Sequence, residues 1–151
     1  LLEGDVADRF AQFPYDITWL VSMIMLADAC ADLHQREAAQ ILYELLLPWE
    51  SQVASLGPSA LGPVARHLGM LAGALEDHDL AAAHFDAALD MSQNLHAPYW
   101  TACAQIEWAQ ILRRRNEPDD EPRTTAMLTE ALDAARRYGV GALERRAQTP
   151  L

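Results

Sequence analysis

Histidines and carboxylates gather at one point of the sequence, and a metal site is first sought in such a pattern. His78 and His84 stand close to Asp77 and Asp79. Zinc-binding histidines on one helix are usually four residues apart, whereas these two are six apart and point in different directions. We therefore interpret the four side chains as solvated residues of a turn and a helix, and we expect no metal ion.

The other histidines and the cysteines offer no local arrangement for catalysis. His34, His67 and His96 have no serine, cysteine or carboxylate at a spacing that builds a relay by local geometry alone. Cys30 and Cys103 lie far apart within apolar patterns, which indicates small buried thiols. We expect neither catalytic residues nor a cofactor. A small helical enzyme stays an alternative, because residues distant in sequence can converge.

The elements that carry these residues are predicted to be helices throughout. β-branched residues are few, Ala and Leu dominate, and apolar residues recur at spacings of three and four. Asp16 and Asp79 are the expected N-caps of two helices, and Pro58 and Pro63 fit the first turn of a third. The predicted helices cover residues 2–13, 17–33, 36–47, a segment that ends near 76, 80–95, 98–115, 123–138 and, in part, 140–147. Residues 49–57 and 116–122 are predicted loops.

Length and charge exclude some classes of function. The length suits one domain over residues 1–151. Twenty-two acidic and eleven basic residues give a net charge of −11, which repels phosphate backbones, so we expect no nucleic acid. No apolar run approaches the ~20 residues that span a bilayer, and the start lacks the features of a signal peptide, so we predict a cytoplasmic protein without a membrane contact. Because the chain begins without Met and ends in a partial helix, we expect a fragment of a longer protein.

A pattern recurs three times along the chain. The second helix of each predicted pair carries a triplet of small and large residues, and the triplets start 42 and 43 residues apart. The first helices repeat a large residue followed by a small one, 42 and 40 residues apart. The triplets are Ala39, Tyr43 and Leu46, then Ala81, Phe85 and Ala88, then Thr124, Leu128 and Ala131; the pairs are Leu26-Ala27, Leu68-Gly69 and Trp108-Ala109. The predicted repeats cover residues 15–57, 58–97 and 98–139.

The small and large residues have a physical role in such a repeat. A small residue lets two helices approach, a large residue four positions on fills the groove between them, and stacked units complete the burial. The pattern resembles the tetratricopeptide (TPR) signature, best kept in Leu68, Gly69, Ala81, Phe85 and Ala88, although the unit is longer than the usual 34 residues. The resemblance implies an all-α, right-handed superhelix of about three helix pairs with partial flanking helices.

A second resemblance concerns the context of the repeats. The stretches 38–48 and 64–72 are similar to the C-terminal helical region of large actinobacterial signalling and transcriptional regulators, in which an ATPase module precedes the repeats. The resemblance implies a sensor or regulatory region. The phosphate-binding motif G-x-x-x-x-G-K-[ST] is absent from these residues, so any nucleotide would bind elsewhere in a longer protein.

The TPR resemblance also implies a binding surface, since the first helices of a TPR array line its concave face. By this resemblance six residues would face a partner, and they combine both charges with one flexible thioether: Asp28, Asp32, Arg66, Met70, Gln110 and Arg113. A carboxylate-clamp TPR needs several basic and amide groups, and here three such groups face two aspartates. Arg113 also fits a structural role, because positive side chains stabilise the carboxyl end of a helix.

These observations predict a non-catalytic protein–protein interaction or scaffolding module. We expect it to hold an internal protein segment or a neighbouring domain of its own chain, rather than a free chain terminus. An alternative is a homo-oligomerisation module, for instance a homodimer that buries leftover apolar edges.

Overall fold

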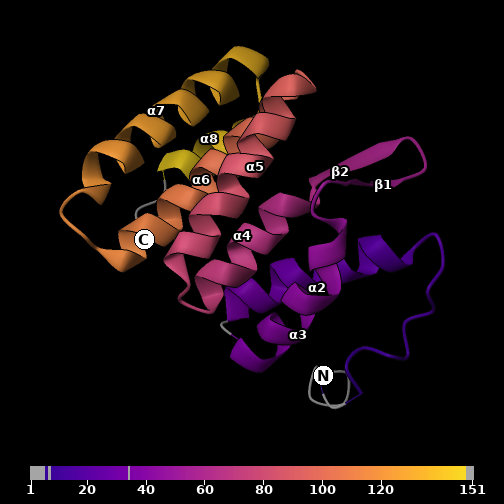
Figure 1. Ribbon diagram of the computed structural model, residues 1–151. Coiled ribbons are helices and arrows are strands. Elements are labelled where there is room, and N and C mark those ends of the chain that lie inside the picture. The colour runs from indigo at the N-terminus through magenta and orange to yellow at the C-terminus, as the bar shows by residue number, and fades with distance from the viewer. Residues whose placement is uncertain (1–5, 7, 34, 149–151) are drawn as a thin grey trace.

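The computed structural model describes residue 6 and residues 8–33 and 35–148, and Figure 1 shows their arrangement. The prediction of a mainly helical chain is confirmed. Part of the predicted leading helix, residues 2–5 and 7, lies outside the described residues. Over residues 8–13 the prediction of a helix is wrong, because they form turns and a bend. The described α-helices are α2 (Trp19–Leu33), α3 (Arg36–Leu46), α4 (Val64–Ala74), α5 (His78–Asn94), α6 (Pro98–Arg115), α7 (Asp120–Tyr138) and α8 (Gly141–Gln148).

A β-hairpin occupies the end of the predicted loop and the region in which the next helix was predicted to begin. After the short 3-10 helix η1 (Leu47–Trp49), strand β1 (Val53–Leu56) pairs antiparallel with β2 (Ser59–Pro63). Gly57 makes the turn with a φ of 58°, a conformation that glycine adopts at little cost. The placement of Pro58 in a helix is therefore wrong: it follows this glycine in the hairpin turn, while Pro63 is the N-cap of α4.

Two helices begin earlier than predicted. The N-cap of α5 is Asp77, whose carboxylate accepts a hydrogen bond from the Leu80 amide at 3.1 Å, so the prediction of Asp79 as the cap is wrong. Helix α7 begins at Asp120, inside the predicted loop. Pro122 is tolerated there because the first-turn amides of a helix need no partner within that helix.

The helices form successive hairpins, and their first members lie in a row. Helix α2 packs on α4, α4 packs on α6, and α6 packs on α8. Helix α3 packs against α2 and α4, α5 packs against α4 and α6, and α7 packs on α6 and α8. We call α2, α4, α6 and α8 the inner row. Helix α7 lies along the outer side of this arrangement in Figure 1.

The repeat positions form the core. The triplet residues are buried in all three pairs, except Leu128, which is partly buried against the same core. Phe85 stacks on Trp108 with ring centroids 5.7 Å apart, and Gly69 lies directly against Phe85. Both cysteines are buried, as predicted. None of the described helices combines the length and the apolarity needed to cross a membrane.

Candidate functional site

A half-open pocket lies on the inner row, between α2, α4, α6 and α8, with one wall from β2. Its volume is about 460 Å³. Four of the residues predicted to face a partner line it: Asp28, Arg66, Met70 and Gln110. Of the other two, Arg113 is exposed outside the pocket, and the side chain of Asp32 falls outside the described part of the structure.

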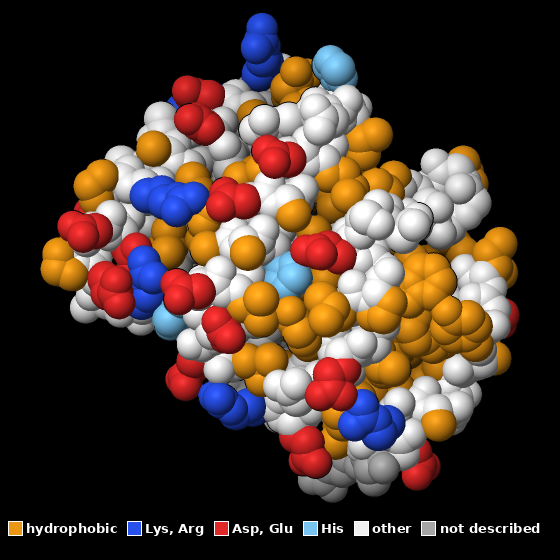
Figure 2. Space-filling view, in the orientation of Figure 1, with side chains coloured by type: hydrophobic (Ala, Val, Ile, Leu, Met, Phe, Trp, Pro, Cys, Tyr) orange, Lys and Arg blue, Asp and Glu red, His pale blue; other side chains and the backbone are white. Residues whose placement is uncertain are grey.

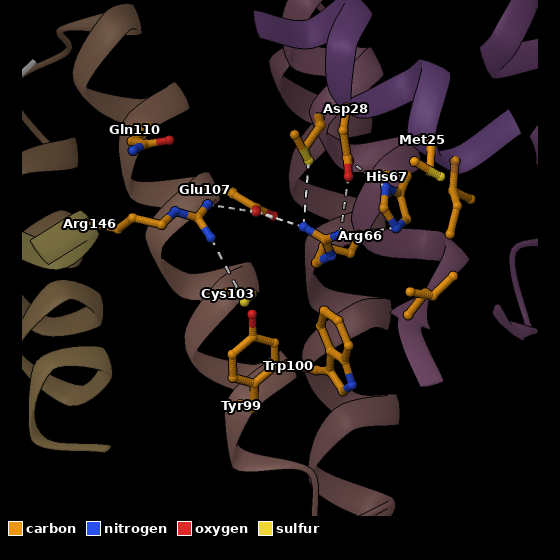
Figure 3. Close-up of a pocket in the computed structure, with 13 residues that line it drawn as sticks. Met25, Asp28, Arg66, His67, Tyr99, Trp100, Cys103, Glu107, Gln110 and Arg146 are labelled. Atoms are coloured by element: carbon orange, nitrogen blue, oxygen red, sulfur yellow. Dashed lines mark hydrogen bonds and ion pairs between the residues drawn. The ribbon is translucent and has the colours of Figure 1, made fainter. Parts of the chain in front are cut away.

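The centre of the pocket is a buried carboxylate between two guanidinium groups. Arg66 of α4 donates through Nη1 to Oε1 of Glu107 on α6, at 2.6 Å. Arg146 of α8 donates through Nη2 to the same oxygen at 2.9 Å. Figure 3 shows the three side chains in a line across the pocket. Two buried atoms of this cluster, Nε of Arg66 and Oε2 of Glu107, have no hydrogen-bond partner among the described residues.

A second hydrogen-bond chain joins α2 to the same arginine. Because a guanidinium only donates, Nη2 of Arg66 donates to Nε2 of His67 at 3.0 Å. The ring proton of His67 is therefore on Nδ1, which donates to Oδ1 of Asp28 at 2.7 Å. Both ring nitrogens are engaged and the imidazole is neutral, so it has no free lone pair with which to accept a proton from a substrate.

The pKa values agree with this assignment. Burial, together with the charge of Arg66, lowers the pKa of His67 even though its bond to Asp28 acts in the opposite direction. Burial acts to raise the pKa of Asp28, but the hydrogen bond from His67 and the charge of Arg66 lower it below its ordinary range. Arg66 stays charged, because Glu107 and Asp28 outweigh the burial that acts to lower its pKa. The pocket thus holds two carboxylates and two guanidinium groups.

Aromatic and sulphur-containing side chains form the rest of the wall. The ring of Trp100 lies 5.5 Å from the guanidinium carbon of Arg66, and Tyr99 meets Trp100 edge to face at 4.7 Å. Gly62 of β2 lets the hairpin approach, since a Cβ there would lie 2.8 Å from the Trp100 ring. Burial raises the pKa of the Cys103 thiol, which disfavours the nucleophilic thiolate.

A separate polar cluster corrects the expectation for His84. This histidine was predicted to be solvated, but it is only 4% exposed. Its Nε2 meets the hydroxyl of Tyr43 at 2.8 Å and its Nδ1 meets Oε1 of Glu50 at 2.6 Å, so it links α5 to α3 and to the segment before the hairpin. Among the described residues, no group of three His, Cys, Asp or Glu side chains is arranged to hold a metal ion.

The sequence did not predict three of the charged and polar side chains at the centre of the pocket. The sequence predicts an isolated His67, but this residue adjoins Arg66 and donates to a carboxylate 39 residues away. Glu107 lies one helical turn before Gln110 on the same face of α6, and that spacing is the signal that could have found it. Arg146 belongs to a helix that was predicted only in part, and its partner lies 39 residues away.

Comparison of the chain with protein-family models, curated proteins and solved structures finds no match.

Proposed function

We propose that this chain is a non-catalytic protein–protein interaction module whose inner row binds a segment of another protein or of a neighbouring domain. The observation that carries the proposal is the pocket on that row. It exposes amide, carboxylate and guanidinium groups beside aromatic and thioether side chains, the mixture that recognises a polypeptide through a few anchoring side chains.

The proposed architecture is a TPR-like right-handed superhelix. Two observations support it: Gly69 packs against Phe85 as the small and large positions of the repeat require, and the first helices of successive pairs contact one another. In such an array the first helices face the ligand, and the pocket lies on those helices. On the second resemblance we propose that the module is the sensor or regulatory region of a larger cytoplasmic signalling ATPase or transcriptional regulator.

The groups in the pocket suit binding better than catalysis. His67 uses both ring nitrogens, the Cys103 thiol has a raised pKa, and Glu107 accepts two guanidinium groups. A general base needs a free lone pair, and a nucleophile needs an activated form. Met25 and Gln110, by contrast, are accessible at the mouth of the pocket and can contact a ligand without rearrangement.

A displayed library of random peptides tests the proposal. Peptides selected on the folded chain are added to isotopically labelled protein, and the shifted backbone amide resonances are mapped. We expect shifts at Met25, Gln110 and their neighbours on the inner row. Asp86 and Asp90, on the outer helix α5, are the comparison positions. Selected peptides that shift only outer positions, or a library that yields no binder, would contradict the proposal.

A second candidate is self-association, which an exposed aromatic surface favours. Tyr15 and Ile17 are 72% and 85% exposed, and the Tyr15 ring lies 4.9 Å from Trp19 and 6.1 Å from Trp49. Figure 2 shows hydrophobic side chains gathered on the side of the molecule where the hairpin lies. Sedimentation analysis of Ile17→Glu tests this candidate, with Leu95→Glu as a control at another exposed aliphatic residue. A wild-type mass that stays at the monomer value over the whole concentration range would exclude it.

A further inference from the structure

Oε1 of Glu107 accepts hydrogen bonds from two guanidinium groups, those of Arg66 and Arg146. Arg146 belongs to α8, the last described helix. We propose that the pocket recognises an arginine side chain of the bound segment, and that this arginine takes the place of Arg146 on Glu107. The inference rests on the proposed interaction function and specifies the chemistry of the partner.

Charge balance favours a cation as the incoming group. With Arg66 and Arg146 in place, the two guanidinium groups offset the carboxylates of Asp28 and Glu107, and the neutral His67 adds no charge. An added carboxylate would leave the partly closed pocket with an unbalanced negative charge. If Arg146 leaves, the pocket itself carries that negative charge, which a cation from the partner neutralises. The net charge of the chain, −11, also attracts a basic partner.

Arg146 is the donor that can leave. Its side chain is 41% exposed, against 7% for Arg66, and its other described contact is a long one of 4.0 Å to Sγ of Cys103. Arg66 is fixed on three sides, by Glu107, by Nε2 of His67 and by the Trp100 ring. Exchange of Arg146 for an external group therefore breaks one short hydrogen bond and moves a partly solvated side chain.

The shape of the pocket favours a guanidinium over an ammonium. Oε2 of Glu107 has no partner, so the carboxylate retains acceptor capacity that the two-pronged geometry of arginine can use. Tyr99 is 44% exposed at the pocket wall and offers an aromatic face to a flat cation, and the thioether of Met25 can cover the aliphatic stem.

Titration with short blocked peptides tests the inference. The probes are acetyl-Gly-Gly-Xaa-Gly-Gly-amide with Arg, Lys or Asp at the centre, and binding is followed by amide resonances of the inner row. We expect the Arg peptide to bind more tightly than the Lys peptide and the Asp peptide not to bind. Arg146→Ala should strengthen binding of the Arg peptide by about tenfold, because it removes the competing group. Arg137→Ala, which removes an exposed arginine of α7 outside the pocket, should change nothing.

A pocket that bound a carboxylate would respond to Arg146→Ala in the opposite way, by losing affinity for its ligand. If Arg146 were the recognition group, Arg146→Ala would abolish binding of the Asp peptide and would not strengthen binding of the Arg peptide, and this result overturns the inference. Glu107→Gln should weaken binding of the Arg peptide at least tenfold, with circular dichroism as the check on folding. If Glu107→Gln does not fold, Arg146→Ala still tests the inference. Arg146 is partly solvated, so we expect its replacement to leave the fold intact.

The two proposals fail in distinguishable ways. Library peptides that shift the inner row but lack arginine, with Arg146→Ala without effect, would overturn the arginine inference and leave the interaction function standing. Binding of the Arg peptide with the expected response to Arg146→Ala, in the absence of any library binder, would support the arginine pocket and count against a role in holding longer segments.

Discussion

Gly69 of α4 lies directly against the ring of Phe85 on α5. A Cβ atom at Gly69 would lie 2.8 Å from both Cδ2 and Cε2 of that ring, closer than carbon atoms pack. Phe85 is fully buried and stacks on Trp108, so the ring has little room to withdraw. The absence of a side chain at one position therefore sets the distance between the two helices of this pair.

Gly69→Ala should consequently destabilise the fold, although alanine is the better helix former by about 1 kcal/mol. Overpacking should outweigh that gain and leave a net loss of about 1–2 kcal/mol in urea denaturation. Gly141→Ala is the matched control, because the nearest atom to a Cβ there is a flexible Arg145 nitrogen at 3.6 Å. Phe85→Leu in the Gly69→Ala background should recover part of the loss. Unchanged stability of Gly69→Ala would contradict the close packing.

The contact between Gly69 and Phe85 illustrates what the sequence predicts well. Small and large residues at helical spacing identify the buried faces of α4 and α5, because close approach and groove filling are local requirements of helix pairs. The hairpin is different. Residues 53–63 have no strand-like alternation, and their pairing depends on a glycine turn and on the Trp100 ring beneath Gly62. Such tertiary contacts leave no periodic pattern in the sequence.

The same distinction applies to the pocket. Asp28, Met70 and Gln110 could be assigned to one face because each directly follows the small residue of its repeat pair. The spacing of Glu107 from Gln110 places it on the same face, but its ion pairs with Arg66 and Arg146 could not be predicted, since those partners lie about 40 residues away in the chain. A buried ion pair is a property of the assembled helices, and no local propensity signals it.

Replacement of Glu107 should be much more damaging than replacement of Arg66. In Glu107→Leu the buried Arg66 loses its short ion pair and retains only Asp28 at 3.9 Å, which should cost about 3–5 kcal/mol of unfolding free energy. In Arg66→Met, by contrast, Arg146 still neutralises Glu107, so the loss should be smaller.

The double variant Arg66→Met/Glu107→Leu should recover most of the stability lost by Glu107→Leu, because no uncompensated buried charge remains. Urea denaturation of the four proteins gives the coupling energy. Additive losses in the double variant would show that the two side chains act independently, in conflict with the 2.6 Å contact between them.

Tyr43→Phe should destabilise the chain by about 1–3 kcal/mol, because the hydroxyl is the partner of Nε2 on the buried His84. The phenylalanine ring fills the same space as the tyrosine ring, so the loss of stability measures the cost of leaving Nε2 of His84 without a partner. Tyr138→Phe is the control, since that ring is largely exposed. Equal thermal midpoints for Tyr43→Phe and wild type would mean that the hydrogen bond contributes nothing to stability.

Acid should destabilise the fold in two steps, and His67 accounts for the first. The pKa of His67 is lower in the folded protein than in the unfolded chain, so the unfolded chain binds the extra proton as the pH falls through about 6.5. The folded state therefore loses stability on acidification from pH 7, by up to about 1.4 kcal/mol per pH unit for this one proton. The pKa of Asp28 is also lowered, so its contribution is present above the ordinary pKa of a carboxyl and disappears at more acidic pH.

His67→Gln separates the two steps, because glutamine can still donate to Asp28 and accept from Arg66 but has no proton to gain. The slope of unfolding free energy against pH between 7 and 5 should become shallower in this variant, while the loss below pH 4 persists. His96→Gln, at an exposed position, should keep the wild-type slope. Urea denaturation at half-unit pH intervals measures all three proteins. An unchanged slope in His67→Gln would show that the acid sensitivity arises elsewhere in the chain.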